Sequence, residues 1–303
     1  MRRSLPFSMK LAITGASGQL GSYLLDELMK DNEVVGVDIR PTEHEAHRNL
    51  VHRADVRTPW TMTSWLKDVD VVVHCAAQVS VVNSILDPLG DLDTNVRGTL
   101  CMLQACKEMG VGRLVYISSA AVYGNPVRVP LDESHPKRPM SFYGSSKASA
   151  EDYVRVFSDT KGLDYMIVRP FNFFSKRADP TNPYSGVITK FVQMALAGKP
   201  ITIEGDGEQT RDFLHATDVS AMVCKAAFSS VKNETLNCCS GKGTSINELA
   251  KAVLRASPNQ VDILHVAPRL GDIRHSVGDV SKARKLLDFE PKMSLDQGVA
   301  SMF

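Results

Sequence analysis

Residues 10–31 read KLAITGASGQLGSYLLDELMKD, and their pattern changes halfway along. The first part, KLAITG, is an apolar run typical of a buried strand, whereas residues 18–31 carry apolar side chains at helical spacing. Gly15, Gly18 and Gly21 lie where the two patterns meet. Because glycine permits tight turns and close packing, this stretch predicts a strand, a tight turn and a helix, which together begin a parallel α/β sheet.

The same alternation continues through the first two-thirds of the chain. Further strands are expected at residues 34–38, 49–56, 69–77, 113–119 and 163–171, with helical stretches between several of them. Consecutive apolar residues at 71–73 fit a sheet that is covered on both faces. We therefore predict the α/β class, with a Rossmann-type doubly wound parallel sheet over residues 9–172. Turn formers then break the pattern, and residues 173–303 are expected to form a smaller mixed α/β domain with some segments returning to the first.

Composition restricts the classes of function. The 303 residues are 43% hydrophobic and 23% charged, with a formal net charge of +1 and no long basic block, so no nucleic-acid or membrane partner is expected. No apolar run is long enough to span a membrane, and residues 1–8 lack the apolar stretch of a signal peptide. No metal site is predicted, because the cysteines lack the spacing of metal ligands. The protein is expected to be cytoplasmic, with these cysteines as reduced thiols: Cys75, Cys101, Cys106, Cys224, Cys238 and Cys239.

The glycine-containing turn has the features of a dinucleotide site, although its spacing is GxxGxxG and matches the GxGxxG fingerprint only in part. Glycines let the backbone approach a pyrophosphate, and the following helix presents N–H groups and a positive dipole end. Asp38 ends the next strand, where its carboxylate can bind adenosine ribose hydroxyls and would repel a 2′-phosphate. Arg40 weakens that preference a little. We therefore predict NAD as the cofactor.

Tyr143 and Lys147, in SFYGSSKASAE (141–151), are four residues apart, which places two helical side chains on one face. The spacing alone is common by chance, so its meaning depends on the rest of the chain. A tyrosine has an ordinary pKa near 10, and a nearby ammonium and the positive nicotinamide ring would both lower that pKa. The two residues are therefore a candidate base and its activator.

A collinear series of motifs gives the pair of Tyr143 and Lys147 a specific context. It runs from about residue 9 to the C-terminus and comprises TGASGQLG (14–21), ADV (54–56), HCAAQ (74–78), NVRGT (95–99), SSAAVYG (118–124), YGSSK (143–147), RPFN (169–172), DPTNPYSGVITKF (179–191), GDGEQTRDF (205–213) and RLGDIRHS (269–276). In these motifs the sequence resembles the extended short-chain dehydrogenase/reductase family and, within it, the NAD-dependent sugar-nucleotide epimerase/dehydratase group. It looks most like the UDP-glucose 4-epimerases of that group.

The resemblance implies three sets of site residues. The catalytic set would be Ser119, Tyr143 and Lys147, with Ser119 bonding the reacting sugar hydroxyl, Tyr143 taking its proton, and Lys147 holding the nicotinamide ribose. Substrate contacts would come from Ser80, Ser119, Tyr143, Asn172, Val187, Phe191, Arg211, Arg269 and Asp272, with Arg274 a lesser candidate; arginine suits a diphosphate. Cofactor contacts, with Asp55 and Val56 at the adenine, would come from Gly15, Ser17, Gly18, Gln19, Leu20, Asp38, Ile39, Arg40, Asp55, Val56, Ala76, Ala77, Gln78, Asn95, Ser118, Tyr143, Lys147 and Pro170.

The implied reaction is epimerisation of a nucleoside-diphosphate sugar. Dehydratases and decarboxylases of this group carry acids directly after the strand-end serine, where this chain has Ala120 and Ala121. The expected activity is that of a UDP-hexose 4-epimerase of the UDP-glucose/UDP-galactose type, or of its N-acetylhexosamine or uronate equivalent, through transient oxidation at C4. The alternatives are a nucleotide-sugar dehydratase, an NAD(P)H-dependent reductase, and a non-catalytic NAD-binding scaffold.

Two further expectations concern specificity and assembly. The stretch FNFFSK (171–176) has Ser175 where the family has glycine, which leaves the sugar undecided between hexose, N-acetylhexosamine and uronate. The resemblance also implies a homodimer formed through the helices near residues 92–108 and 143–160.

Overall fold

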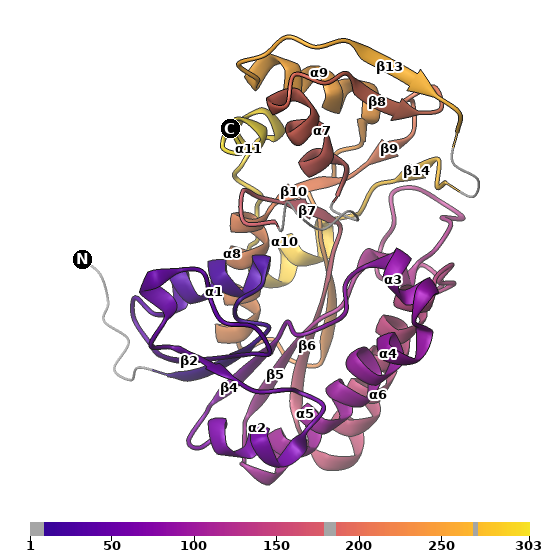
Figure 1. Cartoon of the computed structure of the whole chain (residues 1–303). Coiled ribbons are helices and arrows are strands. Elements are labelled where there is room, and N and C mark those ends of the chain that lie inside the picture. The colour runs from indigo at the N-terminus through magenta and orange to yellow at the C-terminus, as the bar shows by residue number, and fades with distance from the viewer. Residues whose placement is uncertain (1–8, 179–185, 269–271) are drawn as a thin grey trace.

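A computed structural model describes residues 9–178, 186–268 and 272–303. Its largest element is a seven-stranded parallel sheet in the order β11-β6-β5-β4-β1-β2-β3, shown in Figure 1. The strands are β1 (Lys10–Thr14), β2 (Glu33–Asp38), β3 (Val51–Arg53), β4 (Val71–His74), β5 (Arg113–Ile117), β6 (Asp164–Pro170) and β11 (Glu234–Cys238). The predicted doubly wound α/β class is confirmed: five of these strands fall within the ranges expected from the sequence, and β2 begins one residue before its expected range.

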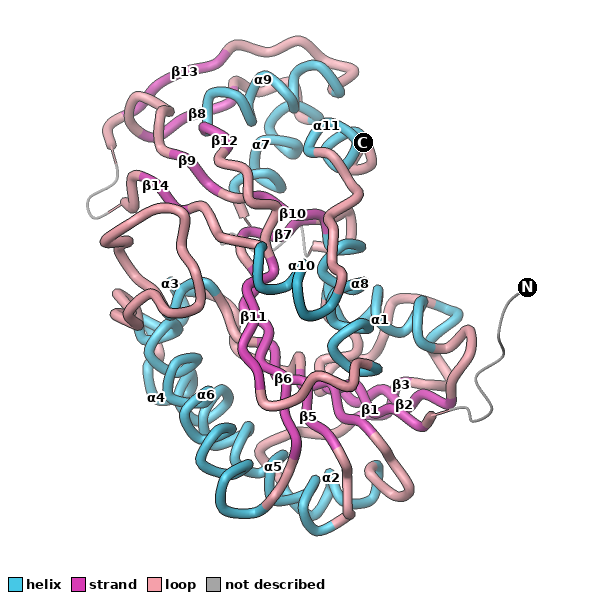
Figure 2. Tube along the Cα trace, turned by 180° about the vertical axis from the view of Figure 1, so that it is seen from behind, coloured by secondary structure: helices cyan, strands magenta, loops and turns pink. Residues whose placement is uncertain are grey.

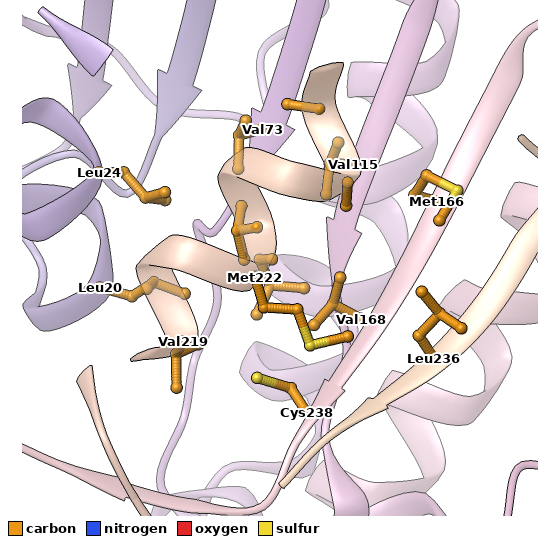
Figure 3. Packing of buried hydrophobic residues seen from close by; sticks show 14 of the residues in the cluster. Leu20, Leu24, Val73, Val115, Met166, Val168, Val219, Met222, Leu236 and Cys238 are labelled. Atoms are coloured by element: carbon orange, nitrogen blue, oxygen red, sulfur yellow. The ribbon is translucent and has the colours of Figure 1, made fainter. Parts of the chain in front are cut away.

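Helices cover both faces of the sheet. One face carries α1 (Gln19–Leu28), α8 (Ala216–Phe228) and α10 (Ser281–Leu287), and the other carries α2 (Pro59–Trp65), α5 (Gly98–Glu108) and α6 (Phe142–Lys161). Successive residues of a strand point to opposite faces, so Val71 and Val73 pack toward α8 while Val72 packs toward α5. Figure 3 shows the apolar core between the sheet and the face covered by α1 and α8, where Met222 of α8 lies against β4, β5 and β6.

The edge strand β11 comes from far beyond residue 172. It pairs with β6 in parallel from Glu234 opposite Met166 to Cys238 opposite Pro170. Since α8 and α10 also cover this sheet, much of the last third of the chain packs on the dinucleotide-type sheet rather than apart from it. The boundary at residue 172 remains a prediction.

A smaller part lies beyond one end of the sheet (Figures 1 and 2). Its apolar core includes Phe174, Ile188, Phe191, Ile203 and Leu249. Its elements are β7 (Asn172–Phe174), α7 (Val187–Leu196), β8 (Ile201–Glu204), β9 (Thr210–Arg211), β10 (Phe213–His215), β12 (Thr244–Ser245), α9 (Ile246–Ala256), β13 (Ile263–Val266), β14 (His275–Ser276) and α11 (Leu295–Ala300).

Five short elements complete the described chain. They are η1 (Glu45–His47), α3 (Val81–Leu86), α4 (Pro88–Leu92), the π-helical turn η2 (Asp93–Arg97) and η3 (Ala120–Val122). The helices α3 and α4 pack against α6. Within the described ranges, no helix combines the length and the apolar character needed to cross a membrane.

Candidate active site

Most residues predicted to hold the cofactor lie at one edge of the sheet. Because the strands are parallel, their carboxyl ends meet at this edge, and ligands of doubly wound sheets gather where the strand order reverses, here between β1 and β4. The residues concerned follow or end six different strands: Gly15 after β1, Asp38 on β2, Asp55 after β3, Ala76 after β4, Ser118 after β5 and Pro170 on β6.

The glycine turn is closed tightly upon itself. Gly15 has φ 68°, and a Cβ there would come within 2.7 Å of the backbone nitrogen of Ala76. A Cβ on Gly21 would overlap the carbonyl oxygen of Gly15. Gly18 begins α1 without a capping side chain, so the first-turn N–H groups of this helix are left without a side-chain acceptor. These N–H groups at the start of the helix fit the pyrophosphate of a dinucleotide.

The end of β2 is fixed to the same turn. The Asp38 carboxylate accepts hydrogen bonds from the backbone N–H groups of Ser17 (3.0 Å) and Arg40 (2.9 Å). Two acceptor sites of the carboxylate remain for ribose hydroxyls. Ile39 is exposed, whereas the side chain of Leu20 packs into the sheet core (Figure 3), so only the backbone of Leu20 can face a cofactor.

The predicted adenine residues are arranged differently. The carboxylate of Asp55 is bound by the guanidinium of Arg57, which also reaches Asp93 at 3.2 Å. The hydrogen bonds from Arg57 hold the pKa of Asp55 below its ordinary value, although partial burial opposes them. Val56 is buried beside Gly98. The role of both residues toward adenine stays a prediction.

A buried amide network holds the chain that follows β4. Asn95 accepts from the backbone N–H of Gln78 at 2.8 Å and donates to the carbonyl of Gln78, to Asp91 and to the hydroxyl of Ser146. Asn95 lies in the π-helical turn η2, a local departure from α-helical geometry that often occurs at functional sites. The network joins the predicted cofactor residues Gln78 and Asn95 to α6.

The structure brings two of the three predicted catalytic side chains into contact. Ser119 lies close enough to Tyr143 for its side chain to lower the pKa of the phenol, and it accepts a hydrogen bond from the backbone N–H of Ala121 at 3.1 Å. One turn later on α6, the Lys147 ammonium donates to the carbonyl of Ile117 at 2.8 Å and lies 4.9 Å from the ring of Tyr116. Burial lowers the pKa of Lys147 to about 8.

The direction of the Tyr143 pKa corrects one expectation. In the chain by itself, burial raises the pKa of Tyr143 above its ordinary value, and the neighbouring side chain of Ser119 only partly offsets this effect. The sequence argument expected the Lys147 ammonium and the positive nicotinamide ring together to lower it, and of these two only the ammonium belongs to the chain. That ammonium is bound to the Ile117 carbonyl, so in the chain alone desolvation dominates.

The sequence argument did not identify a buried ion pair that lies next to this site. Glu151 accepts two hydrogen bonds from Arg169, at 2.7 and 2.6 Å, and one from Ser118 at 2.7 Å. Burial alone would raise the pKa of Glu151, but Arg169 and Ser118 together hold it below its ordinary value. Glu151 follows Lys147 by four residues, so the helical spacing that revealed Tyr143 and Lys147 already pointed to it.

The predicted substrate residues are more scattered. On β9, Arg211 forms an ion pair with Asp272 at 2.6 Å, and burial lowers the pKa of Arg211 despite this partner. Arg274 instead pairs with Asp206 on the surface. Arg269 and residues 179–185 of the motif DPTNPYSGVITKF lie outside the described residues.

The four other candidates differ in exposure and surroundings. Asn172 is exposed on β7, and Val187 is half-buried at the start of α7. Phe191 is buried in the core of the smaller part, so the structure does not bring its side chain into the site. Ser80 caps α3 by accepting from the backbone of Asn83.

Comparisons with known proteins agree with this geometry. Residues 11–239 match the family described as the NAD dependent epimerase/dehydratase family. The UDP-glucose 4-epimerase of Mycolicibacterium smegmatis is 34% identical over 307 residues, covering 96% of each chain. The structure of the Thermotoga maritima UDP-glucose 4-epimerase with UDP-glucose has a TM-score of 0.92 at 31% identity, covering 97% of each chain. That of the UDP-N-acetylglucosamine 4-epimerase of Methanobrevibacter ruminantium with UDP-N-acetylmuramic acid has a TM-score of 0.92 at 32% identity and the same coverage.

Proposed function

The chain belongs to the NAD dependent epimerase/dehydratase family, and from this premise we propose that it is a UDP-hexose 4-epimerase that keeps NAD bound through the reaction. The membership predicted from the collinear motifs is thereby confirmed. The observation that carries the finer proposal is the placement of Ser119 next to Tyr143 beside η3, whose residues are Ala120, Ala121 and Val122. No carboxylate stands there to eliminate water.

NAD, when bound, supplies the hydride acceptor. Tyr143, as phenolate, takes the proton of the C4 hydroxyl, and Ser119 holds that hydroxyl by a second hydrogen bond. With NAD bound, the Lys147 ammonium together with the positive nicotinamide ring would favour the phenolate, and Lys147 would hold the nicotinamide ribose. After the keto-sugar has turned, Tyr143 returns the proton to the oxygen. Proton and hydride both come back to the sugar, so the reaction consumes no external reductant.

Two groups on the smaller part are proposed to bind the nucleotide. Arg211 would contact the diphosphate and Asp272 the ribose hydroxyls, and both already lie together on one surface of β9 and its neighbouring loop. Related proteins of equal structural similarity act on UDP-glucose and on UDP-N-acetylglucosamine by their names. The hexose and its N-acetylated or uronate equivalents therefore form the substrate class to be tested.

The test begins without added cofactor. The purified protein is incubated with UDP-glucose, UDP-N-acetylglucosamine and UDP-glucuronate, and NMR follows the appearance of the C4 epimer, while mass spectrometry identifies released NAD. Loss of water would instead indicate a dehydratase, and consumption of added NADPH a reductase.

The Tyr143→Phe variant removes only the phenolic oxygen. Loss of the acid/base group is expected to reduce kcat by about 10³-fold. Tyr153→Phe changes an exposed tyrosine on the same helix and serves as the matched control. Unchanged turnover in Tyr143→Phe would contradict the proposal.

A further inference from the structure

Ser175, the residue that departs from the family pattern, has a specific partner. Its side chain is fully buried, and its hydroxyl accepts a hydrogen bond from the side-chain amide of Gln19 at 2.9 Å. The backbone N–H of Arg177 also donates to this hydroxyl, at 3.3 Å. Glycine at position 175 offers no such acceptor, so this contact exists only because of the substitution.

The backbone at this position does not require glycine. Among the described non-glycine residues, positive φ angles occur at Asp68, Asn233 and Asp288, and Ser175 is not one of them. A side chain at position 175 therefore causes no backbone strain of the left-handed kind. The serine gains a hydrogen bond without a conformational cost.

A second contact fastens the same segment to the same helix. Gln19, Tyr23 and Asp26 are spaced i, i+4 and i+7 on one face of α1. Arg177 donates to Asp26 at 2.5 Å, and its guanidinium lies 4.2 Å from the centre of the Tyr23 ring. Residues 175–178 thus hold α1 at its first turn and again about two turns later.

The two fastened pieces have different predicted tasks. Gln19 is the first residue of α1, directly after the uncapped Gly18, where the pyrophosphate of NAD is expected. Residues 175–178 follow β7, which carries the substrate candidate Asn172 and pairs with β10. The hydrogen bond between Gln19 and Ser175 therefore joins the cofactor turn directly to the strand that leads into the smaller part.

We propose that Ser175 is a positioning residue, which through Gln19 fixes the first turn of α1 and so tightens the binding of NAD. The inference rests on the proposed function only in taking NAD as the ligand of the glycine turn. A fixed first turn loses less conformational freedom when the pyrophosphate binds, so the same N–H groups yield more affinity.

The experiment is a double-mutant cycle on NAD affinity. NAD is removed from the full-length protein, and calorimetry measures its dissociation constant in wild type, Ser175→Ala, Gln19→Ala and the double variant. Each single change is expected to weaken NAD about three- to tenfold, the range of one hydrogen bond. The double variant should be no weaker than Gln19→Ala alone. Ser175→Gly, which restores the family residue, should weaken NAD at least as much as Ser175→Ala.

Ser158→Ala provides the matched control. It removes a buried serine hydroxyl bonded to Asn233, near the other end of α6 from Tyr143 and away from the glycine turn, and should leave NAD affinity unchanged. Independent effects of Ser175→Ala and Gln19→Ala would overturn the inference. So would a lowered melting temperature of Ser175→Ala with unaltered NAD affinity, because that marks a purely structural serine. The assay contains no sugar, so it does not depend on epimerase activity. If the effects of the two substitutions are coupled but the protein does not epimerise any sugar, only the epimerase proposal is refuted.

Discussion

At the scale of single residues, the candidate site is supported by the buried carboxylate of Glu151, which is not among the predicted substrate contacts. Glu151 is fully buried, and its carboxylate is held by Arg169 from β6 and Ser118 from the end of β5. Ser118 directly precedes Ser119, and Glu151 lies on the face of α6 that carries Tyr143 and Lys147. The ion pair therefore fixes the strand end and the helix that present the candidate catalytic groups to one another.

Glu151→Gln is expected to destabilise the protein by about 3 kcal/mol at neutral pH, because it leaves the buried guanidinium of Arg169 without its counter-charge. The folded-state pKa of Glu151 lies below its ordinary value of 4.5. The contribution of the carboxylate is therefore complete above that ordinary value and disappears as the pH falls through the folded-state pKa. Urea unfolding from neutral to acidic pH measures it.

The control for this prediction is Asp152→Asn on the same helix, since Asp152 is an exposed carboxylate that also pairs with Arg155. Exposed pairs contribute about 0–1 kcal/mol, so this variant should differ little from wild type at any pH. A difference between Glu151→Gln and wild type that stays constant into acid would contradict the charge argument.

At the scale of elements, the turn between β1 and α1 leaves little room for side chains at its glycines. Its three glycines serve different needs: a positive φ and contact with Ala76 at Gly15, an uncapped helix start at Gly18, and close packing on Gly15 at Gly21. Each need is visible in the sequence as a glycine, but only the structure shows which neighbour requires it.

Gly21→Ala tests this packing. The added methyl group overlaps the Gly15 carbonyl, so α1 must move away from the turn, with an expected loss of about 2 kcal/mol in stability. Because the moved helix N-terminus no longer meets the pyrophosphate, NAD affinity should fall about tenfold or more. Thermal unfolding and NAD titration measure the two effects. In Gly112→Ala, whose methyl group meets only ordinary contacts, both quantities should stay near wild type; equal behaviour of the two variants would refute the argument.

At the scale of the whole molecule, one surface formed by helices exposes several large apolar side chains among the described residues. Ile85, Leu86, Leu89 and Leu92 are exposed on α3 and α4, and Val156 is exposed on α6, the helix against which α3 and α4 pack (Figure 1). Contiguous exposed apolar side chains of this kind mark interaction surfaces. The sequence argument named residues 92–108 and 143–160, which include the exposed Leu92 and Val156, and the other exposed apolar residues of this face lie on α3 and α4.

We predict that this face forms a two-fold symmetric homodimer. Leu89, whose side chain is 76% exposed, would be buried there, so Leu89→Lys should convert the dimer to a monomer in light scattering. Trp60→Lys on α2, at a residue that is 73% exposed and outside this face, should leave the dimer intact. A wild-type protein that is monomeric at micromolar concentration would contradict the prediction.

The sequence by itself determined the local features of this protein. The strand–helix alternation, the glycine turn, Asp38 at the end of β2, and the spacing of Tyr143, Lys147 and Glu151 all follow from patterns within a few residues. Such patterns can be recognised in the sequence because buried side chains recur with the periodicity of each helix or strand. Consecutive strands from β1 to β6 are neighbours in the sheet, as the preference for adjacent connections favours, except that β4 pairs with β1 instead of β3.

Only the tertiary structure decided the contacts between distant segments. It placed β11 beside β6, paired Glu151 with Arg169, joined Gln19 to Ser175 across 156 positions, and turned Lys147 toward the Ile117 carbonyl. It also raised the pKa of Tyr143 through burial, against the expectation from its neighbours in sequence. Desolvation and long-range hydrogen bonds depend on which surfaces meet, and no periodicity within one segment records its partner.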